Sequence, residues 1–146
     1  MTQIPDKKPV NSSEDEILKS FIRAMPLMIT AIDDDNLFIE WNHECERVTG
    51  FLKEEIINNP DPSSLLYPDP KYFESLKEFW VKNKGTYINQ VWKIRCKNGK
   101  DKAVSWSNIS PEYPVKGWRS WAIGLDVSEL KDVSEKLSES ENLFKT

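Results

Sequence analysis

The chain has 146 residues, 38% of them hydrophobic and 11% aromatic, which is enough to bury the core of one domain. Its net charge of −4 argues against a nucleic-acid partner, which would need a basic stripe, and against direct contact with an anionic membrane. The sequence contains no signal peptide and no apolar run long enough to span a bilayer, so we expect a cytoplasmic protein.

The first part of the chain predicts a helix followed by a hairpin. Residues 1–12 are polar and are expected to form a flexible lead-in. A capping box with Ser13 as N-cap then starts a helix over 13–25, whose apolar residues recur at helical spacing. Two apolar strands, 27–32 and 37–41, are separated by an Asp-rich turn and form an antiparallel pair.

The remainder predicts short helices, three more strands and a final helix. Helical pieces are expected over 43–49, 53–58, 64–67 and 72–80, and the last of these is amphipathic. Strands are expected over 86–97, 102–110 and 118–125. The order predicts an α+β domain over 13–127, followed by a C-terminal helix over 128–146 that Asp126 caps.

The turn at Asn98-Gly99 decides which side chains share a face of the sheet. A two-residue loop would place Trp92 with Ala103 and Ser105, whereas a loop of odd length would place it with Val104 and Trp106. We favour the odd loop because it gathers the large apolar side chains on one face. Gln90 and Asn108 then lie on that apolar face, where an amide needs a partner from the backbone, from water or from a ligand.

Residues 41–51 (WNHECERVTGF) hold the only histidine of the chain beside one of its two cysteines. His43, Glu44, Cys45 and Glu46 are adjacent, so on a helix they point in different directions and cannot converge on one metal ion. The same geometry argues against a Cys–His catalytic pair. We therefore expect no metal and no catalytic residues, with His43 partly exposed and Cys45 buried.

Three motifs carry a resemblance to a known family. They are Asn42 with Thr49-Gly50-Phe51 and Glu54-Glu55-Ile56, then Lys97-Asn98-Gly99-Lys100, and finally 123–131, IGLDVSELK. At these spacings they are similar to the N-x6-T-G-[YF]-x3-E-[LI], K-[DN]-G and D-[IV]-[TS]-E-x-K motifs of PAS domains. From about residue 14 to residue 131, the chain therefore resembles a PAS sensory domain.

The resemblance implies a five-stranded antiparallel sheet with short helices over one face, and flanking N- and C-terminal helices. It implies a non-catalytic sensor or relay module of a larger signalling protein, such as a sensor histidine kinase of a two-component system or a cyclase. Asp126, Ser128 and Glu129 would transmit the signal to adjacent domains of the same chain. Glu44 stands where the family usually has a small residue, so its charge must point outward or find a partner.

The sequence does not identify a cofactor, but we expect neither haem nor covalently bound flavin. The helical segment 71–85 lacks the histidine with which PAS haem sensors generally hold haem, and 59–63 (NPDPS) replaces the cysteine motif that forms a covalent flavin adduct. A small-molecule ligand would lie between the sheet and the helix over 72–80, and the alternative is that the same side chains fill the core. The pocket candidates are Phe73, Gln90, Trp92, Ile94, Val104, Trp106 and Asn108.

The other face of the sheet predicts an interface. Its apolar side chains would be costly to leave in water, so the N-terminal helix or a second subunit should cover them. We expect a homodimer, and the alternative to a sensor is a ligand-free module for protein–protein dimerisation. The interface candidates, including a heptad seam on the last helix, are Phe21, Ile22, Trp121, Ile123, Leu130, Val133 and Leu137.

Overall fold

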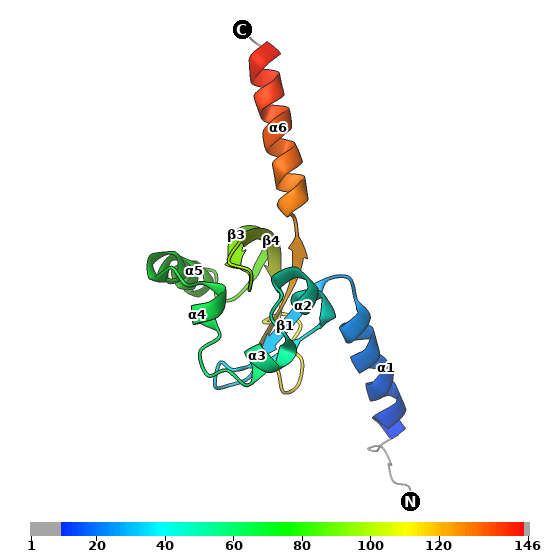
Figure 1. The fold of residues 1–146 in the computed structure, drawn as a ribbon. Helices are drawn as coiled ribbons and strands as arrows, with labels where there is room; N and C mark the ends of the chain where they lie inside the picture. Colours follow the sequence, from blue (N-terminus) through cyan, green and yellow to red (C-terminus); the bar gives the residue numbers. More distant parts are fainter. Residues whose placement is uncertain (1–9, 145–146) are drawn as a thin grey trace, which may run out of the picture.

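The computed structural model describes residues 10–144 and has the predicted α+β architecture (Figure 1). Its helices are α1 (Val10–Ala24), α2 (His43–Thr49), α3 (Lys53–Ile57), α4 (Ser63–Leu66), α5 (Pro70–Lys82) and α6 (Ser128–Phe144). Its strands are β1 (Met28–Ile32), β2 (Phe38–Trp41), β3 (Tyr87–Arg95), β4 (Asp101–Asn108) and β5 (Ser120–Asp126). The order of helices and strands along the chain matches the expectation from sequence throughout.

The five strands form one antiparallel sheet in the order β2-β1-β5-β4-β3. Trp92 lies opposite Val104 and Gln90 lies opposite Trp106, which confirms the odd-length hairpin loop. The register shifts between Tyr87 and Gln90, so Tyr87 pairs with Asn108 at the far end of the same two strands. This bulge rearranges the start of β3, and its effect on the candidate site is described below.

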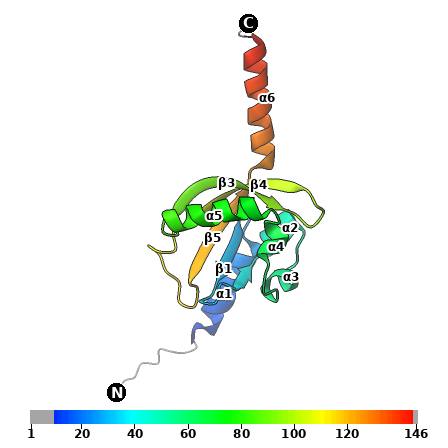
Figure 2. The same cartoon turned by 90° about the vertical axis from the view of Figure 1, so that its left-hand side faces the viewer.

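The helices α2, α3, α4 and α5 cover one face of the sheet, as expected (Figure 2). Each contributes at least one buried apolar side chain to a core that also contains inward-facing residues of β1–β4. The helical members of the core are Cys45, Val48, Ile56, Leu66 and Leu76, and the principal strand members are Met28, Trp41, Trp92, Ile94, Val104 and Trp106. We refer to this side of the sheet as the inner face.

The two flanking helices leave the domain at opposite ends instead of covering the sheet (Figures 1 and 2). α1 begins at Val10, so Ser13 lies inside the helix and the expected N-cap is wrong. The expected lead-in over 1–12 is also wrong for residues 10–12, which are helical, and its first nine residues lie outside the described part of the chain. None of the helices within residues 10–144 has the length and apolar character that crossing a bilayer requires.

Candidate ligand cleft

A cleft of about 740 Å³ opens between the inner face of the sheet and the helices α4 and α5. Its lining comes from all five strands and from the segment between α4 and β3. Of the seven side chains expected to line a pocket, five do so: Phe73, Trp92, Ile94, Trp106 and Asn108. The topology therefore brings most of the predicted set together around one space.

Two of the expected pocket residues lie elsewhere. Gln90 is exposed, and its amide nitrogen donates a hydrogen bond to the carbonyl oxygen of Ile88 at 3.2 Å. Gln90 pairs with Trp106 and so has the inward register that alternation predicts, but it is exposed on the edge strand β3, and Tyr87, beyond the bulge, lines the cleft instead. Val104 is fully buried in the core and does not line the cleft.

Aromatic rings build the wall of the cleft on the side of α5. Tyr67 and Phe73 stack with their ring centroids 5.6 Å apart, and Trp80 meets the ring of Trp92 edge-on at 5.9 Å. The indole N–H of Trp92 donates to the hydroxyl oxygen of Tyr67 at 3.2 Å. Burial raises the pKa of Tyr67 above its usual range, so this hydroxyl stays neutral. Offset and edge-on ring pairs of this kind stabilise a core beyond the area that they bury.

Sequence reasoning missed part of this wall. Tyr67, Trp80 and Tyr87 all line the cleft, whereas only Phe73 was expected from the segment between α4 and β3. The signal for Trp80 was present, because it lies on the apolar stripe of the amphipathic helix. Tyr67 follows a one-turn helix in a proline-rich segment, and no periodicity of the sequence indicates its direction.

The polar groups of the cleft fall into two classes. The amide of Asn108 is already satisfied, since it donates to Ser120 Oγ at 2.8 Å and accepts from Ser110 Oγ at 2.7 Å. The indole nitrogens of Trp80 and Trp106 are different, because both are buried and neither has a hydrogen-bond partner among the described residues. Asn108 thus supports the sheet, and the two indole N–H groups are buried donors without a partner among the described residues.

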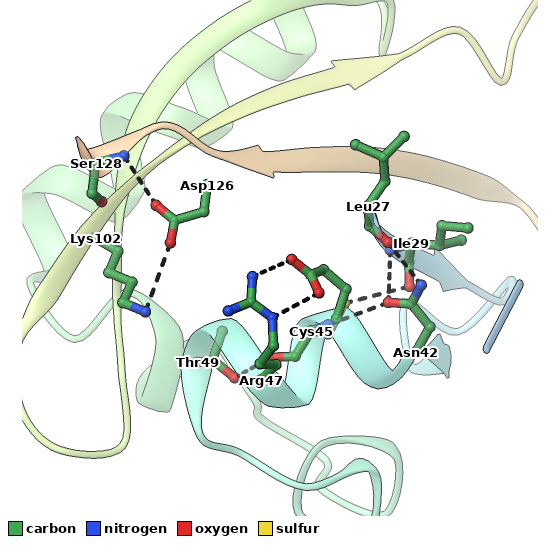
Figure 3. A network of polar contacts seen from close by, with 10 residues as sticks. Leu27, Ile29, Asn42, Cys45, Arg47, Thr49, Lys102, Asp126 and Ser128 are labelled. Carbon is green, nitrogen blue, oxygen red and sulfur yellow. Dashed lines mark hydrogen bonds and ion pairs between the residues drawn. The ribbon is translucent and has the colours of Figure 1, made fainter. Parts of the chain in front are cut away.

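Away from the cleft, the buried side chain of Asn42 forms the main polar connection between neighbouring elements (Figure 3). Its side-chain oxygen caps α2 by accepting from Cys45 N at 3.3 Å, and it also accepts from Ile29 N at 3.0 Å. Its side-chain nitrogen donates to the carbonyl oxygens of Ile22 in α1 and Leu27 before β1, at 2.9 and 2.8 Å. One buried amide therefore joins α1, β1 and α2.

The neighbouring reactive residue types carry no shared chemistry. His43 is exposed and Cys45 is buried, as expected. Burial raises the pKa of the Cys45 thiol to about 12, so it stays protonated and donates weakly to the carbonyl oxygen of Ile29 at 3.5 Å. In the described part of the chain, no three residues of the types His, Cys, Asp and Glu come together as a metal site.

Glu44 finds a partner on its own helix. Arg47 binds its carboxylate through two hydrogen bonds of 2.9 and 2.5 Å, and this interaction holds the pKa of Glu44 below its usual value. Figure 3 shows Arg47 facing the junction of β5 and α6, where Asp126 and Lys102 lie. The charges of Asp126 and Lys102 also act on the pKa of Glu44, with opposite signs. Four charged groups from α2, β4 and β5 therefore interact at the start of α6.

The start of α6 is tied to β4. Asp126 ends β5 and accepts a hydrogen bond from Ser128 N at 3.0 Å, so it caps the helix from the position before Val127. Ser128 Oγ accepts from Ala103 N at 2.8 Å, and Val127 N donates to the carbonyl oxygen of Ala103 at 2.9 Å. Glu129 is exposed, and none of the hydrogen bonds and ion pairs found among the described residues involves it.

Four of the seven interface candidates are exposed and three are partly buried, among them Trp121, which also contributes to the lining of the cleft. Trp121 and Ile123 alternate with the inward-facing Ala122 and Gly124, which puts them on the outer face of the sheet, and both are partly buried. Phe21 on α1 is 62% exposed because α1 turns away from the sheet, and Ile22 is partly buried. On α6, the seam of Leu130, Val133 and Leu137 is exposed along its length.

No protein-family model and no curated protein matches the chain by sequence. Solved structures do match it by shape. A PAS domain from Colwellia psychrerythraea superposes with a TM-score of 0.59 at 20% identity, covering 80% of this chain and 98% of that one. An RNA-binding light-oxygen-voltage receptor matches with a TM-score of 0.66 at 18% identity, covering 97% of this chain and 41% of the receptor.

A third similar structure is a domain of a sensor histidine kinase/response regulator from Geobacter sulfurreducens. It matches with a TM-score of 0.53 at 13% identity, covering 77% of this chain and 94% of that domain. At such identities the likeness establishes the fold and leaves the activity open. The five-stranded antiparallel sheet, the short helices on its inner face and these matches agree on one architecture.

Proposed function

From the premise that this chain has the PAS fold, we propose that it is a cytoplasmic sensory module of a larger signalling protein. Its cleft binds a small molecule, and α6 carries the resulting change to an output domain of the same chain. The similar structure from a sensor histidine kinase/response regulator supports a kinase as that output. Similar solved structures include PAS and light-oxygen-voltage domains, and we assign no catalytic step to the module.

The observation that carries this proposal is the position of β4 between the cleft and α6. Trp106 of this strand lines the cleft, and Ala103 of the same strand holds Val127 and Ser128 through its backbone N–H and C=O groups. A ligand that displaces the indole of Trp106 would shift β4 and with it the first turn of α6. Continuity in space supports such coupling, and a coupling free energy has to be measured.

The test uses the junction in the full-length protein. Asp126→Ala removes the carboxylate that accepts from Ser128 N and lies 3.7 Å from Lys102 Nζ. Loss of such a cap destabilises the helix start by about 1 kcal/mol, so we expect lost signal output with an unfolding temperature near that of the wild type. Asp132→Ala, an exposed aspartate of the same helix, is the matched control. Wild-type output from Asp126→Ala would contradict the proposed route.

A second candidate function is a ligand-free dimerisation module. It is favoured by the apolar side chains that α1 and α6 leave exposed on the outer face, among them Val91 and Leu125. A second copy of the chain would cover this face and align the seam of α6 with its equivalent. Both candidate functions involve a dimer. They differ in whether a ligand occupies the cleft.

Sedimentation velocity and native mass spectrometry of the purified domain separate the two candidates. Leu125→Lys places a charge on the outer face and should dissociate a dimer, whereas Leu52→Lys, of similar exposure but on α3's N-terminal side, should not. A dimer with a co-purified small molecule supports the sensor, and a dimer with an empty cleft supports the dimerisation module. A monomeric wild-type chain at high concentration would argue against the interface in both.

A further inference from the structure

The charge of the cleft lining has one sign. Three cationic side chains, Lys77, Lys84 and Arg119, line it, and no carboxylate does so among the described residues. The chain as a whole carries a net charge of −4, so this local excess of positive charge runs against the overall balance. A cleft with cations and no acid attracts anions and disfavours cationic ligands.

The three cations are not equally available. Lys77 pairs with Glu74 at 3.3 Å, and its ammonium lies 4.9 Å from the ring centroid of Phe73. Arg119 donates to the carbonyl oxygen of Asp33 and to the side-chain oxygen of Asn36, which uses two of its five N–H groups and leaves the others free to bind a ligand. None of the ion pairs found within residues 10–144 involves Lys84.

Lys84 and Arg119 lie at the same end of the sheet. Lys84 precedes the start of β3, Arg119 precedes the start of β5, and β4 runs antiparallel to both and ends between them. Contacts support this placement: a Cβ built on Gly85 would lie 3.8 Å from Pro111 Cγ, and Ser110 Oγ lies 3.3 Å from Ser120 Oγ. Lys84 lies beside β3 and Arg119 reaches toward the β1–β2 turn, so the two cations border the same end of the sheet from its two sides.

The rings of Trp80 and Trp106 belong to the wall of the cleft, and their indole nitrogens are buried. This part of the wall therefore offers apolar ring surface rather than polar groups. Aromatic rings form the rest of the wall and favour a flat apolar body.

We propose that the cleft takes an aromatic carboxylate, with its flat apolar body between the rings and its carboxylate at the end of the cleft that Lys84 and Arg119 border. This inference rests on the proposed function, since it names the class of ligand for the same cleft. A single negative charge fits a lining that is mainly apolar, because each further charge would have to be desolvated.

The probes are two matched pairs: indole-3-acetate with indole-3-acetamide, and 3-phenylpropionate with its amide. The readout is the set of indole N–H signals of the ¹⁵N-labelled protein, six tryptophans in all, with Trp80 and Trp106 assigned through Trp80→Phe and Trp106→Phe. At neutral pH the acids are anions of nearly the same shape as the amides. We expect at least one acid to shift the Trp80 and Trp106 signals and its amide to bind roughly tenfold more weakly, through loss of charge-assisted hydrogen bonds.

Two cleft variants and one control locate the charge. Lys84→Asn suits the left-handed backbone at this position (φ 55°), and Arg119→Gln removes the guanidinium; each should weaken the acid roughly tenfold and leave the amide unchanged. Lys100→Gln, exposed in the β3–β4 hairpin at the other end of the sheet, should change neither. Since Arg119→Gln also disturbs the β1–β2 turn, Lys84→Asn tests the role of positive charge without that disturbance.

The outcomes separate the two proposals. If an acid and its amide bind with equal affinity and both shift the two indole signals, the preference for a carboxylate is wrong, but the cleft still binds a ligand. Acid binding that Lys84→Asn and Arg119→Gln leave intact overturns the assigned cations. No shift of either indole signal with any of the four probes overturns the inference, and an empty cleft by native mass spectrometry in the same preparation counts against the proposed function as well.

Discussion

The two faces of the same sheet present opposite surfaces, although their side chains alternate along the same strands. On β3, Trp92 is 7% exposed on the inner face, and its neighbour Val91 is 53% exposed on the outer face. On β5, Gly124 is buried against Trp106, whereas Leu125 points outward and is exposed. The outer face also carries apolar side chains on β5, although Lys93 and Ser105 make it more polar on β3 and β4, so composition alone does not explain which face is covered.

The difference comes from the connections. The segment between β2 and β3 holds four helices and returns across the inner face, whereas α1 and α6 leave the sheet at its ends. The inner face therefore acquires an aromatic wall and a cleft, and the outer face keeps unpaired apolar side chains. A single antiparallel sheet can in this way offer one surface for a small molecule and another for a protein.

The largest contrast is expected between Trp92→Ala and Val91→Ala. Trp92 touches the rings of Phe79, Trp80 and Tyr87, so its truncation leaves a cavity and should lower the free energy of unfolding by about 3–5 kcal/mol. Val91→Ala, one residue away on the outer face, should change it by less than about 0.5 kcal/mol. Urea unfolding of both variants in the monomeric state measures the difference. A loss above about 1 kcal/mol for Val91→Ala would contradict the exposure of the outer face in the monomer.

The second prediction concerns the amide that ties α1 to the domain. Asn42→Ala leaves Ile29 N and the carbonyl oxygens of Ile22 and Leu27 without their partner, so the loss should be about 2–4 kcal/mol. Hydrogen exchange should also become faster at the end of α1. His43→Ala, an exposed neighbour, is the control and should change neither quantity measurably. Unchanged protection of α1 in Asn42→Ala would show that other contacts hold this helix.

Much of the inner face was predictable from sequence, because it rests on regular patterns. The odd hairpin loop follows from the alternation of Trp92 and Ile94 with Lys93, and from the matching positions of Val104 and Trp106. Two aromatic side chains of the cleft, Tyr67 and Tyr87, were not predictable in the same way. One follows a one-turn helix and the other precedes a bulge, and neither feature leaves a periodic signal.

The roles of polar residues were the least predictable part. Asn42 was recognised as a motif position, but its four hydrogen bonds join segments up to 20 residues apart and depend on the tertiary fold. Asn108 was expected to face a ligand, yet its amide is used by Ser110 and Ser120. The unpaired donors are indole nitrogens instead, in residues that a pattern treats as apolar. The direction of α1 also had no sequence signal, because an apolar stripe fits both a covering helix and a dimer surface.

The third prediction tests how closely the inner face is packed. An added Cβ at Gly124 would lie 2.8–3.0 Å from three ring atoms of Trp106, so the indole has to move. We expect Gly124→Ala to lower the free energy of unfolding by about 1–3 kcal/mol and to shift the indole N–H signal of Trp106. Leu125→Ala, the next residue on the outer face, should cost less than about 1 kcal/mol in the monomer. A stable Gly124→Ala with an unmoved Trp106 signal would contradict the packing described.

The smallest effect is expected from the charged groups near α6. Arg47→Met should lower the free energy of unfolding by at most about 1 kcal/mol, because the arginine side chain is largely exposed and its ion pair is screened. The pH dependence of this stability difference is more informative than its size. The hydrogen bond from Arg47 lowers the folded-state pKa of Glu44, so the pair's contribution is complete above the pKa of Glu44 in the unfolded chain.

That contribution should therefore fade as the pH falls through the lower, folded-state pKa of Glu44. The difference between wild type and Arg47→Met is expected to be constant from about pH 7 to pH 5 and to shrink as the pH falls below the pKa of Glu44 in the unfolded chain. Glu44→Gln and the double variant complete a thermodynamic cycle that isolates the pair from the field of Asp126 and Lys102. If the difference were independent of pH across the acid range, Arg47 would act through packing rather than charge. The junction would then resemble the inner face, where the shape of the side chains rather than their charge holds the elements together.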